Sequence, residues 1–142
     1  MSSSKPFNVN SYGRFEKEAA EIIRNYPQFK IDLDNFKKLL RQNPEQGEHL
    51  GSGVYKARIK ITEKPAGKSY GARVIYAIFT VAEEVLLLKV YDKSVRKDMT
   101  KYEVEQIRAL VSVLRSQKKE KAKSQSQSTQ LSRGKPKQKR KT

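Results

Sequence analysis

Several residue types and patterns are missing from this 142-residue chain, and each absence removes a class of structure or function. Cysteine is absent, so the protein can form neither disulfide bonds nor a thiolate metal site. The single histidine, His49, excludes a histidine cluster, and in a loop without a carboxylate partner motif it is read as an ordinary polar residue rather than a general base. No apolar run approaches the roughly 20 residues of a membrane-spanning helix. The N-terminal MSSSKPFNVN also lacks the apolar core of a secretory signal, so we expect a cytoplasmic protein with no membrane partner.

Positive charge is in large excess, with 31 Lys and Arg against 15 Asp and Glu and a net charge of +16. Such an excess indicates a polyanionic partner, for which nucleic acid is the default. Residues 117–142 contain ten Lys or Arg and one acid, which gives +9, and the remaining chain carries +7. This Lys-, Ser- and Gln-rich segment buries too little apolar area to offset the entropy of ordering. We therefore expect one domain at 1–116 and a disordered tail at 117–142, which serves either as an electrostatic arm for RNA or the ribosome or only as an aid to solubility.

Three segments, 50–61, 72–79 and 84–93, have the residue types and the bounding turns of β-strands. In the first, apolar residues alternate with cations, so the two kinds point to opposite faces. The apolar set is Tyr55, Ala57, Ile59 and Ile61, and the cationic set is Lys56, Arg58 and Lys60. Arg73 opens the second strand, and in the third Leu86, Leu88 and Val90 are expected on one face with Lys89, Tyr91 and Lys93 on the other. The pattern predicts a small antiparallel sheet, apolar behind and basic in front.

Helical signals lie on both sides of these strands. Ser11 is a plausible N-cap for a helix that Pro27 stops, and a second helix should end before Asn43-Pro44. These two helices predict a hairpin that covers the apolar back of the sheet, and residues 7–10 suggest a short edge strand. A capping box at Thr100 and Glu103 opens a third helix, expected to run to about Ser116. The fold class is therefore α+β, with 46–53 and 62–71 as loops.

The basic face has three possible roles if the strands pair in order. It could bind phosphate, because Arg holds phosphate oxygens bidentately and stays protonated. It could cleave RNA without a metal, because RNA brings its own nucleophile, the 2′-OH, and cations stabilise the charge that develops on the phosphate oxygens. It could also be a solvated surface of extended lysines. The loop residues Gly67-Lys68-Ser69 lack the spacing of a Walker phosphate loop, so a solvated hairpin is their simplest interpretation.

Five segments together resemble a known family. They are FEKEA at 15–19, NYPQFKIDL at 25–33, LGSGVYKARI at 50–59, GKSYGARVIY at 67–76 and LLLKVYDKS at 86–94. In this order they are similar to the RelE/ParE superfamily of type II toxins, closest to the RelE/HigB-like branch. The resemblance covers about 7–114. It implies an N-terminal helical hairpin packed on a small antiparallel sheet, followed by a C-terminal helix.

The resemblance also implies a function: an mRNA endonuclease that acts on the ribosome and is neutralised by a cognate antitoxin. The 2′-OH attacks the adjacent phosphate, with no metal and no small-molecule cofactor. Matched residue by residue, the implied catalytic set is Lys56, Arg58, Arg73, Tyr91 and Lys93, with Lys56 as the candidate general base. The implied RNA-binding set is Lys60, Lys68, Tyr70 and Lys89.

The sequence departs from the family pattern in two places. Met99 lies where RelE carries a tyrosine after the last core strand, so Tyr91 is the candidate substitute and the general acid stays open. Tyr70 stands where many relatives have glycine. Two alternatives therefore stay open: a ParE-like inhibitor of DNA gyrase, and a homologue that binds RNA or antitoxin without catalysis.

Overall fold

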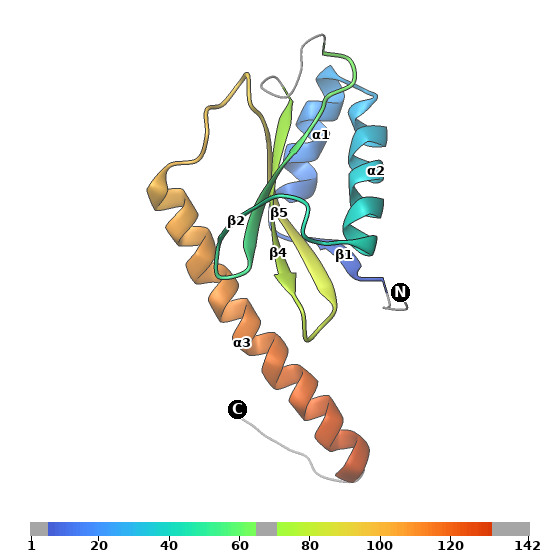
Figure 1. Ribbon diagram of the computed structural model, residues 1–142, viewed down its shortest axis with the longest axis vertical. Helices are drawn as coiled ribbons and strands as arrows, with labels where there is room; N and C mark the ends of the chain where they lie inside the picture. Colours follow the sequence, from blue (N-terminus) through green and yellow to red (C-terminus); the bar gives the residue numbers. More distant parts are fainter. Residues whose placement is uncertain (1–5, 65–70, 132–142) are drawn as a thin grey trace.

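A five-stranded sheet with helices on both faces forms the body of the protein (Figure 1). The computed structural model describes residues 6–64 and 71–131, and for residues 119–131 it describes the backbone only. The elements follow in the order β1 (Asn8–Ser11), α1 (Phe15–Asn25), α2 (Phe29–Gln42), β2 (Glu48–Gly51), β3 (Val54–Ile59), β4 (Ala72–Phe79), β5 (Glu84–Asp92) and α3 (Lys101–Leu131). The predicted α+β class is confirmed.

The strands lie in the order β1-β5-β4-β3-β2. The three predicted strands β3, β4 and β5 pair in sequence and are antiparallel, as expected. The expectation of a purely antiparallel sheet is wrong at one edge, because β1 pairs with β5 in parallel. The 46–53 loop also contains a short strand, β2, which pairs with β3. The short edge strand suggested at 7–10 is confirmed as β1, displaced by one residue, whereas β2 is only four residues long and too short for alternation to reveal it.

Helices α1 and α2 form the predicted hairpin and cover one face of the sheet. Helix α1 buries Phe15, Ala19 and Ile22, and α2 buries Phe29, Leu33, Phe36 and Leu40. This spacing of three and four residues places the apolar side chains of each helix on one stripe. The predicted N-cap at Ser11 is wrong: this residue ends β1, and Arg14 precedes the first helical residue. The Ser11 hydroxyl instead donates a hydrogen bond to the Glu16 carboxylate.

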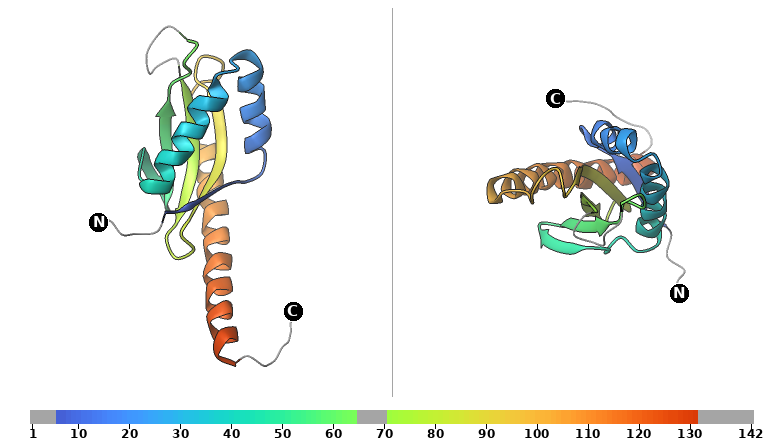
Figure 2. Two further views of the ribbon diagram at one scale, coloured as in Figure 1. Left: turned by 90° about the vertical axis from the view of Figure 1, so that its right-hand side faces the viewer. Right: turned by 90° about the horizontal axis from the view of Figure 1, so that it is seen from above.

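Helix α3 packs on the opposite face, where its buried Val111 joins an apolar cluster formed by β3, β4 and β5. The capping box is confirmed, because Glu103 N–H donates to Thr100 Oγ1 at 3.1 Å and Thr100 N–H donates to Glu103 Oε1 at 2.8 Å. The helix was expected to end near Ser116, where a disordered tail was expected to begin. It instead continues to Leu131 and extends beyond the lower end of the sheet (Figure 2). Neither proline nor glycine occurs between Ser116 and Leu131 to stop it. The rest of the predicted tail, 132–142, lies outside the described residues.

The face that carries α3 is therefore not basic along its whole length. Ile75, Ala77 and Leu86 are buried there under α3, and only the end of the face near Arg58 and Arg73 is cationic. All eight residues of β4 are buried, because helices cover both faces of this central strand. The cations are thus gathered at one end of the sheet.

A bulge in β5 changes which side chains share a face. Ile75 pairs with Lys89 and Tyr76 with Leu87, so Leu88 has no partner on β4. One extra residue reverses the alternation that follows it. The expectation that Val90 shares a face with Leu86 and Leu88 is consequently wrong, since Val90 packs on the side of the helical hairpin.

Candidate phosphate-binding site

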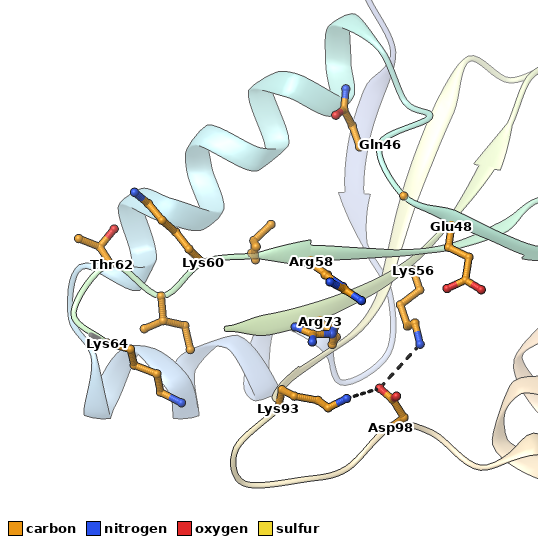
Figure 3. A pocket seen from close by; sticks show the side chains of 13 residues that line it. Gln46, Glu48, Lys56, Arg58, Lys60, Thr62, Lys64, Arg73, Lys93 and Asp98 are labelled. Atoms are coloured by element: carbon orange, nitrogen blue, oxygen red, sulfur yellow. Dashed lines mark ion pairs between the residues drawn. The ribbon is translucent and has the colours of Figure 1, made fainter. Parts of the chain in front are cut away.

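A cleft of about 810 Å³ opens at the cationic end of the sheet (Figure 3). Six cations contribute to its wall, and two acids, Glu48 and Asp98, are also present. The cations are Lys56, Arg58, Lys60, Lys64, Arg73 and Lys93. Four of the five predicted catalytic residues and one predicted RNA-binding residue, Lys60, therefore lie together.

Arg58 and Arg73 lie directly opposite each other on β3 and β4, and Arg73 lies opposite Tyr91 on β5. Arg73 is 3% exposed, whereas Arg58 is exposed to the cleft. Like charges directly opposite each other destabilise a sheet. A pair of guanidinium groups in such a position therefore favours a site that receives an anion.

Asp98 is a residue of the site that the sequence analysis missed. Its Oδ1 lies 3.1 Å from Lys93 Nζ and 3.7 Å from Lys56 Nζ, so one carboxylate bridges β3 and the chain after β5 (Figure 3). The hydrogen bond from Lys93 is the main cause that lowers the pKa of Asp98. Burial raises this pKa, but the positive charges of Lys56, Lys93 and Arg73 add to the lowering, so the net pKa is lowered. The carboxylate is therefore charged at neutral pH. Charge patterning alone could not assign it a partner, because it lies in a loop.

Tyr91 does not line the cleft, but it contacts the residues that do. Its hydroxyl lies 3.4 Å from Asp98 Oδ1, and the Arg96 guanidinium lies 5.2 Å from its ring centroid. Burial raises the pKa of Tyr91, and the nearby Asp98 charge raises it further, partly offset by a hydrogen bond from the Met99 backbone. Tyr91 therefore stays protonated at neutral pH. Its placement favours a positioning role through Asp98 over direct contact with substrate.

Lys89 lies away from the cleft, which corrects its expected place on the basic face. The β5 bulge directs its side chain toward α1, where Nζ lies 2.9 Å from Glu18 Oε2. Glu18 also accepts a hydrogen bond from Val90 N–H at 3.1 Å. Lys89 therefore joins the sheet to the helical hairpin. The other two predicted RNA-binding residues, Lys68 and Tyr70, lie outside the described residues.

Lys64, which lines the cleft, forms a second ion pair that the sequence did not indicate. Lys64 Nζ lies 2.6 Å from Asp92 Oδ1, and both side chains are less than 10% exposed. Burial by itself would raise the pKa of Asp92, but hydrogen bonds from Lys64 and Ser94 outweigh it and the net pKa is lowered. The pair ties the chain after β3 to the end of β5.

The segment before β2 forms another part of the wall. Tyr76 holds it, since its hydroxyl donates to Pro44 O at 2.6 Å and accepts from Gln46 N–H at 2.9 Å. Gly47 follows, and a Cβ there would lie 2.2 Å from Lys56 O, so only glycine lets this segment approach β3 so closely. The main chain at Lys56 is therefore enclosed by a segment that a buried tyrosine fixes.

His49 has a structural role in this arrangement. Its Nε2 accepts a hydrogen bond from Gly53 N–H at 3.1 Å, and its ring stacks on Tyr55 with centroids 4.8 Å apart. The expected loop position of His49 is wrong, since it lies in β2 and pairs with Tyr55, and its contacts are those of a polar structural residue. In the part of the chain that the structure describes, no three His, Cys, Asp or Glu side chains gather in a way that could hold a metal ion.

The fold and the cleft together define a class: a small α+β protein with a concentrated cationic site for a polyanion. A family model described as "RelE toxin of RelE / RelB toxin-antitoxin system" matches residues 36–133, which include every described cation of the cleft. The chain therefore belongs to the RelE family and is a toxin of the type II toxin–antitoxin class.

Solved structures give a weaker likeness. A mutant of the E. coli RelE toxin in the free state is 16% identical, with a TM-score of 0.48 over 71% of this chain and 92% of that chain. The isolated E. coli RelE toxin is also 16% identical, with a TM-score of 0.39 over 73% and 98% of the two chains. The comparison with curated proteins gives no match. Among the described helices, none combines the length and apolar character needed to cross a membrane.

Proposed function

We propose that the protein is an endoribonuclease that cuts mRNA on the ribosome and uses the 2′-OH of the message as nucleophile. The observation that carries this proposal is the pairing of Arg58 with Arg73 across β3 and β4, in one cleft with Lys56 and Lys93. A phosphodiester gains negative charge on its non-bridging oxygens as the 2′-oxygen attacks. Two guanidinium groups, permanently charged and able to bind two oxygens each, suit that charge.

In the proposed step every bond is made and broken within the RNA, and only protons are exchanged with the groups around it. A base removes the 2′-OH proton, the oxygen forms a bond to phosphorus, and the bond to the 5′-oxygen breaks as that oxygen takes a proton. The products are a 2′,3′-cyclic phosphate and a 5′-OH. Buried Arg73 would stabilise the transition state from a fixed position, and Lys56 is the candidate base. The proposed reaction takes its nucleophile from the substrate and uses neither a metal nor a cofactor.

Two macromolecular partners follow from the proposal. The first is the ribosome with its message, to which the net charge of +16 and the extended α3 are suited. The second is a cognate antitoxin with acidic surface, whose charge would complement the cleft and speed association. The family description pairs its toxin with an antitoxin in the same way.

The deciding experiment is primer extension on a reporter message in a cell-free translation system. Arg58→Ala is the informative variant because Arg58 is exposed, whereas replacing the buried Arg73 needs a parallel folding check. Arg41→Ala, an exposed arginine on α2, is the control for charge loss. We expect the wild type and Arg41→Ala to cut within translated codons, and Arg58→Ala to cut about 100-fold more slowly, as for loss of one transition-state donor.

Other outcomes would redirect the assignment. If RNA without ribosomes is cut as well as RNA in translation, the nuclease assignment stands but the ribosome is not required. No cutting at all, together with inhibition of DNA supercoiling, would instead indicate a gyrase inhibitor. Undiminished cutting by Arg58→Ala would show that the arginine pair is not the reaction site.

A further inference from the structure

An acidic side chain, Asp98, lies among the cations that line one side of the cleft. The same oxygen of Asp98, Oδ1, faces Lys93 Nζ at 3.1 Å, Lys56 Nζ at 3.7 Å and the Tyr91 hydroxyl at 3.4 Å. Figure 3 shows the carboxylate between the two lysines, below Arg58 and beside Arg73. Three proton donors therefore converge on one carboxylate oxygen. Of these three, the two lysines line the cleft and are the donors that an entering anion would also use.

The loop presents Asp98 from a fixed backbone. On one side, Arg96 forms an ion pair with Glu103 of α3 and lies over the Tyr91 ring. On the other side, Met99 packs in the apolar cluster beneath α3. The side chain of Asp98 itself is 51% exposed. It can therefore rotate into solvent without any movement of the anchored residues around it.

We propose that Lys56 and Lys93 form a phosphate subsite and that Asp98 occupies it as an internal competitor, which an RNA phosphodiester must displace. This inference rests on the proposed function and adds a selectivity to it. A carboxylate and a phosphodiester each carry one negative charge and accept hydrogen bonds from the same donors. RNA free in solution has to replace the Asp98 contacts from a low concentration. A message held by the ribosome arrives at a high effective concentration, so the competitor selects against free RNA.

The test measures binding and not cleavage. A fluorescent single-stranded RNA with 2′-O-methyl groups at every position cannot be cut by 2′-OH attack. Its affinity is measured by anisotropy over a salt series for the full-length wild type, Asp98→Asn and Asp34→Asn. Asp34 lies on the exposed side of α2, so its variant changes the net charge equally but away from the cleft.

We expect Asp98→Asn to bind roughly fivefold more tightly at low salt, since two partly exposed ion pairs no longer compete. Its logarithmic salt slope should steepen by about 0.7, one additional phosphate contact on a single strand. Asp34→Asn should change affinity by less than about twofold because its charge is distant and screened. Binding by Asp98→Asn that is weaker than, or equal to, that of Asp34→Asn would overturn the proposal, as would undetectable binding by Asp98→Asn.

A second variant pair localises the effect. In a Lys93→Ala background, Asp98→Asn should give little further gain, because the subsite has lost one of its two lysines. A full gain in that background would mean a general change of charge and would overturn the subsite. Cleavage assays keep the two proposals separate. Tighter RNA binding by Asp98→Asn without any cleavage by the wild type would reject only the proposed nuclease activity. Cleavage by the wild type without tighter binding by Asp98→Asn would reject only the proposed role of Asp98 as a competitor.

Discussion

The ion pair of Lys64 and Asp92 should contribute far more to stability than an exposed pair. The two charged atoms lie 2.6 Å apart, and the side chains are 9% and 8% exposed. Asp92 also accepts hydrogen bonds from Ser94 N–H and Oγ, at 3.0 and 2.8 Å. Asp92→Asn keeps an acceptor for Ser94 but leaves the Lys64 ammonium without its counterion. Breaking a buried pair costs about 3–5 kcal/mol, and since some solvent reaches this one we expect about 2–3 kcal/mol.

The assay is a double-mutant cycle by urea unfolding at pH 7, with Asp92→Asn, Lys64→Met and the double variant. We expect a coupling energy of about 1.5 kcal/mol or more. The matched control is the pair Arg108–Glu105, with its atoms 3.4 Å apart and its side chains 37% and 60% exposed. Its coupling should be no more than about 0.5 kcal/mol. Equal coupling energies for the two pairs would refute the reasoning that burial gives the first pair its strength.

The pH dependence of the same variant provides an independent check. Because the pKa of Asp92 is lowered in the folded state, the unfolded chain takes up its proton first as the pH falls. The stabilisation is therefore fully present above the unfolded value, about 3.9, and is lost as the pH falls through the folded value. The difference in unfolding free energy between wild type and Asp92→Asn should shrink below about pH 4. A difference that stays constant down to pH 2.5 would contradict this assignment.

Two further predictions concern the cleft wall and the long helix. Tyr76→Phe removes the hydroxyl that bonds to the backbone of Pro44 and Gln46, in a fully buried side chain. The unfolding free energy, measured by urea unfolding, should fall by about 2 kcal/mol. A loss below about 0.5 kcal/mol would show that the hydroxyl is dispensable. Truncation after Lys118 keeps its ion pair with Glu84 but removes nine Lys or Arg and one acid. The melting temperature should stay unchanged while ribosome affinity falls, most strongly at low salt, and equal affinity across a salt series would exclude the tail from binding.

Features set by local sequence were predictable. Alternation on β3 separates Ala57, which is buried on the side of the helical hairpin, from Lys56 and Arg58, which line the cleft, and Ile61 just beyond the strand continues the buried side. The capping box at Thr100 forms as expected, because both of its hydrogen bonds join residues three apart. In each case the controlling interactions lie within one turn or one strand.

Features set by distant pairing were not predictable. The β5 bulge depends on how Leu88 and its neighbours meet β4, and nothing in an apolar run marks the extra residue. Its consequence is that Lys89 joins Glu18 of α1 and leaves the predicted basic face. The place of Asp98 in the cleft was not predictable for a related reason. Its partner Lys56 is far away in sequence, and the loop between β5 and α3 has no periodicity that would show where the side chain points.

The charge of the cleft is governed by the end of β5 and the loop that follows it as much as by the cations of the strands. Three of the six cations in the wall, Lys56, Lys64 and Lys93, face Asp92 or Asp98 from this one stretch. The two acids have different environments, since the Asp92 side chain is 8% exposed beside Lys64 whereas that of Asp98 is 51% exposed. Asp92 is therefore the permanent counterion of the pair, and Asp98 is the one that an RNA phosphodiester displaces in the proposed competition. A family of toxins with the same strand cations could accordingly differ in RNA affinity through substitutions in this loop alone.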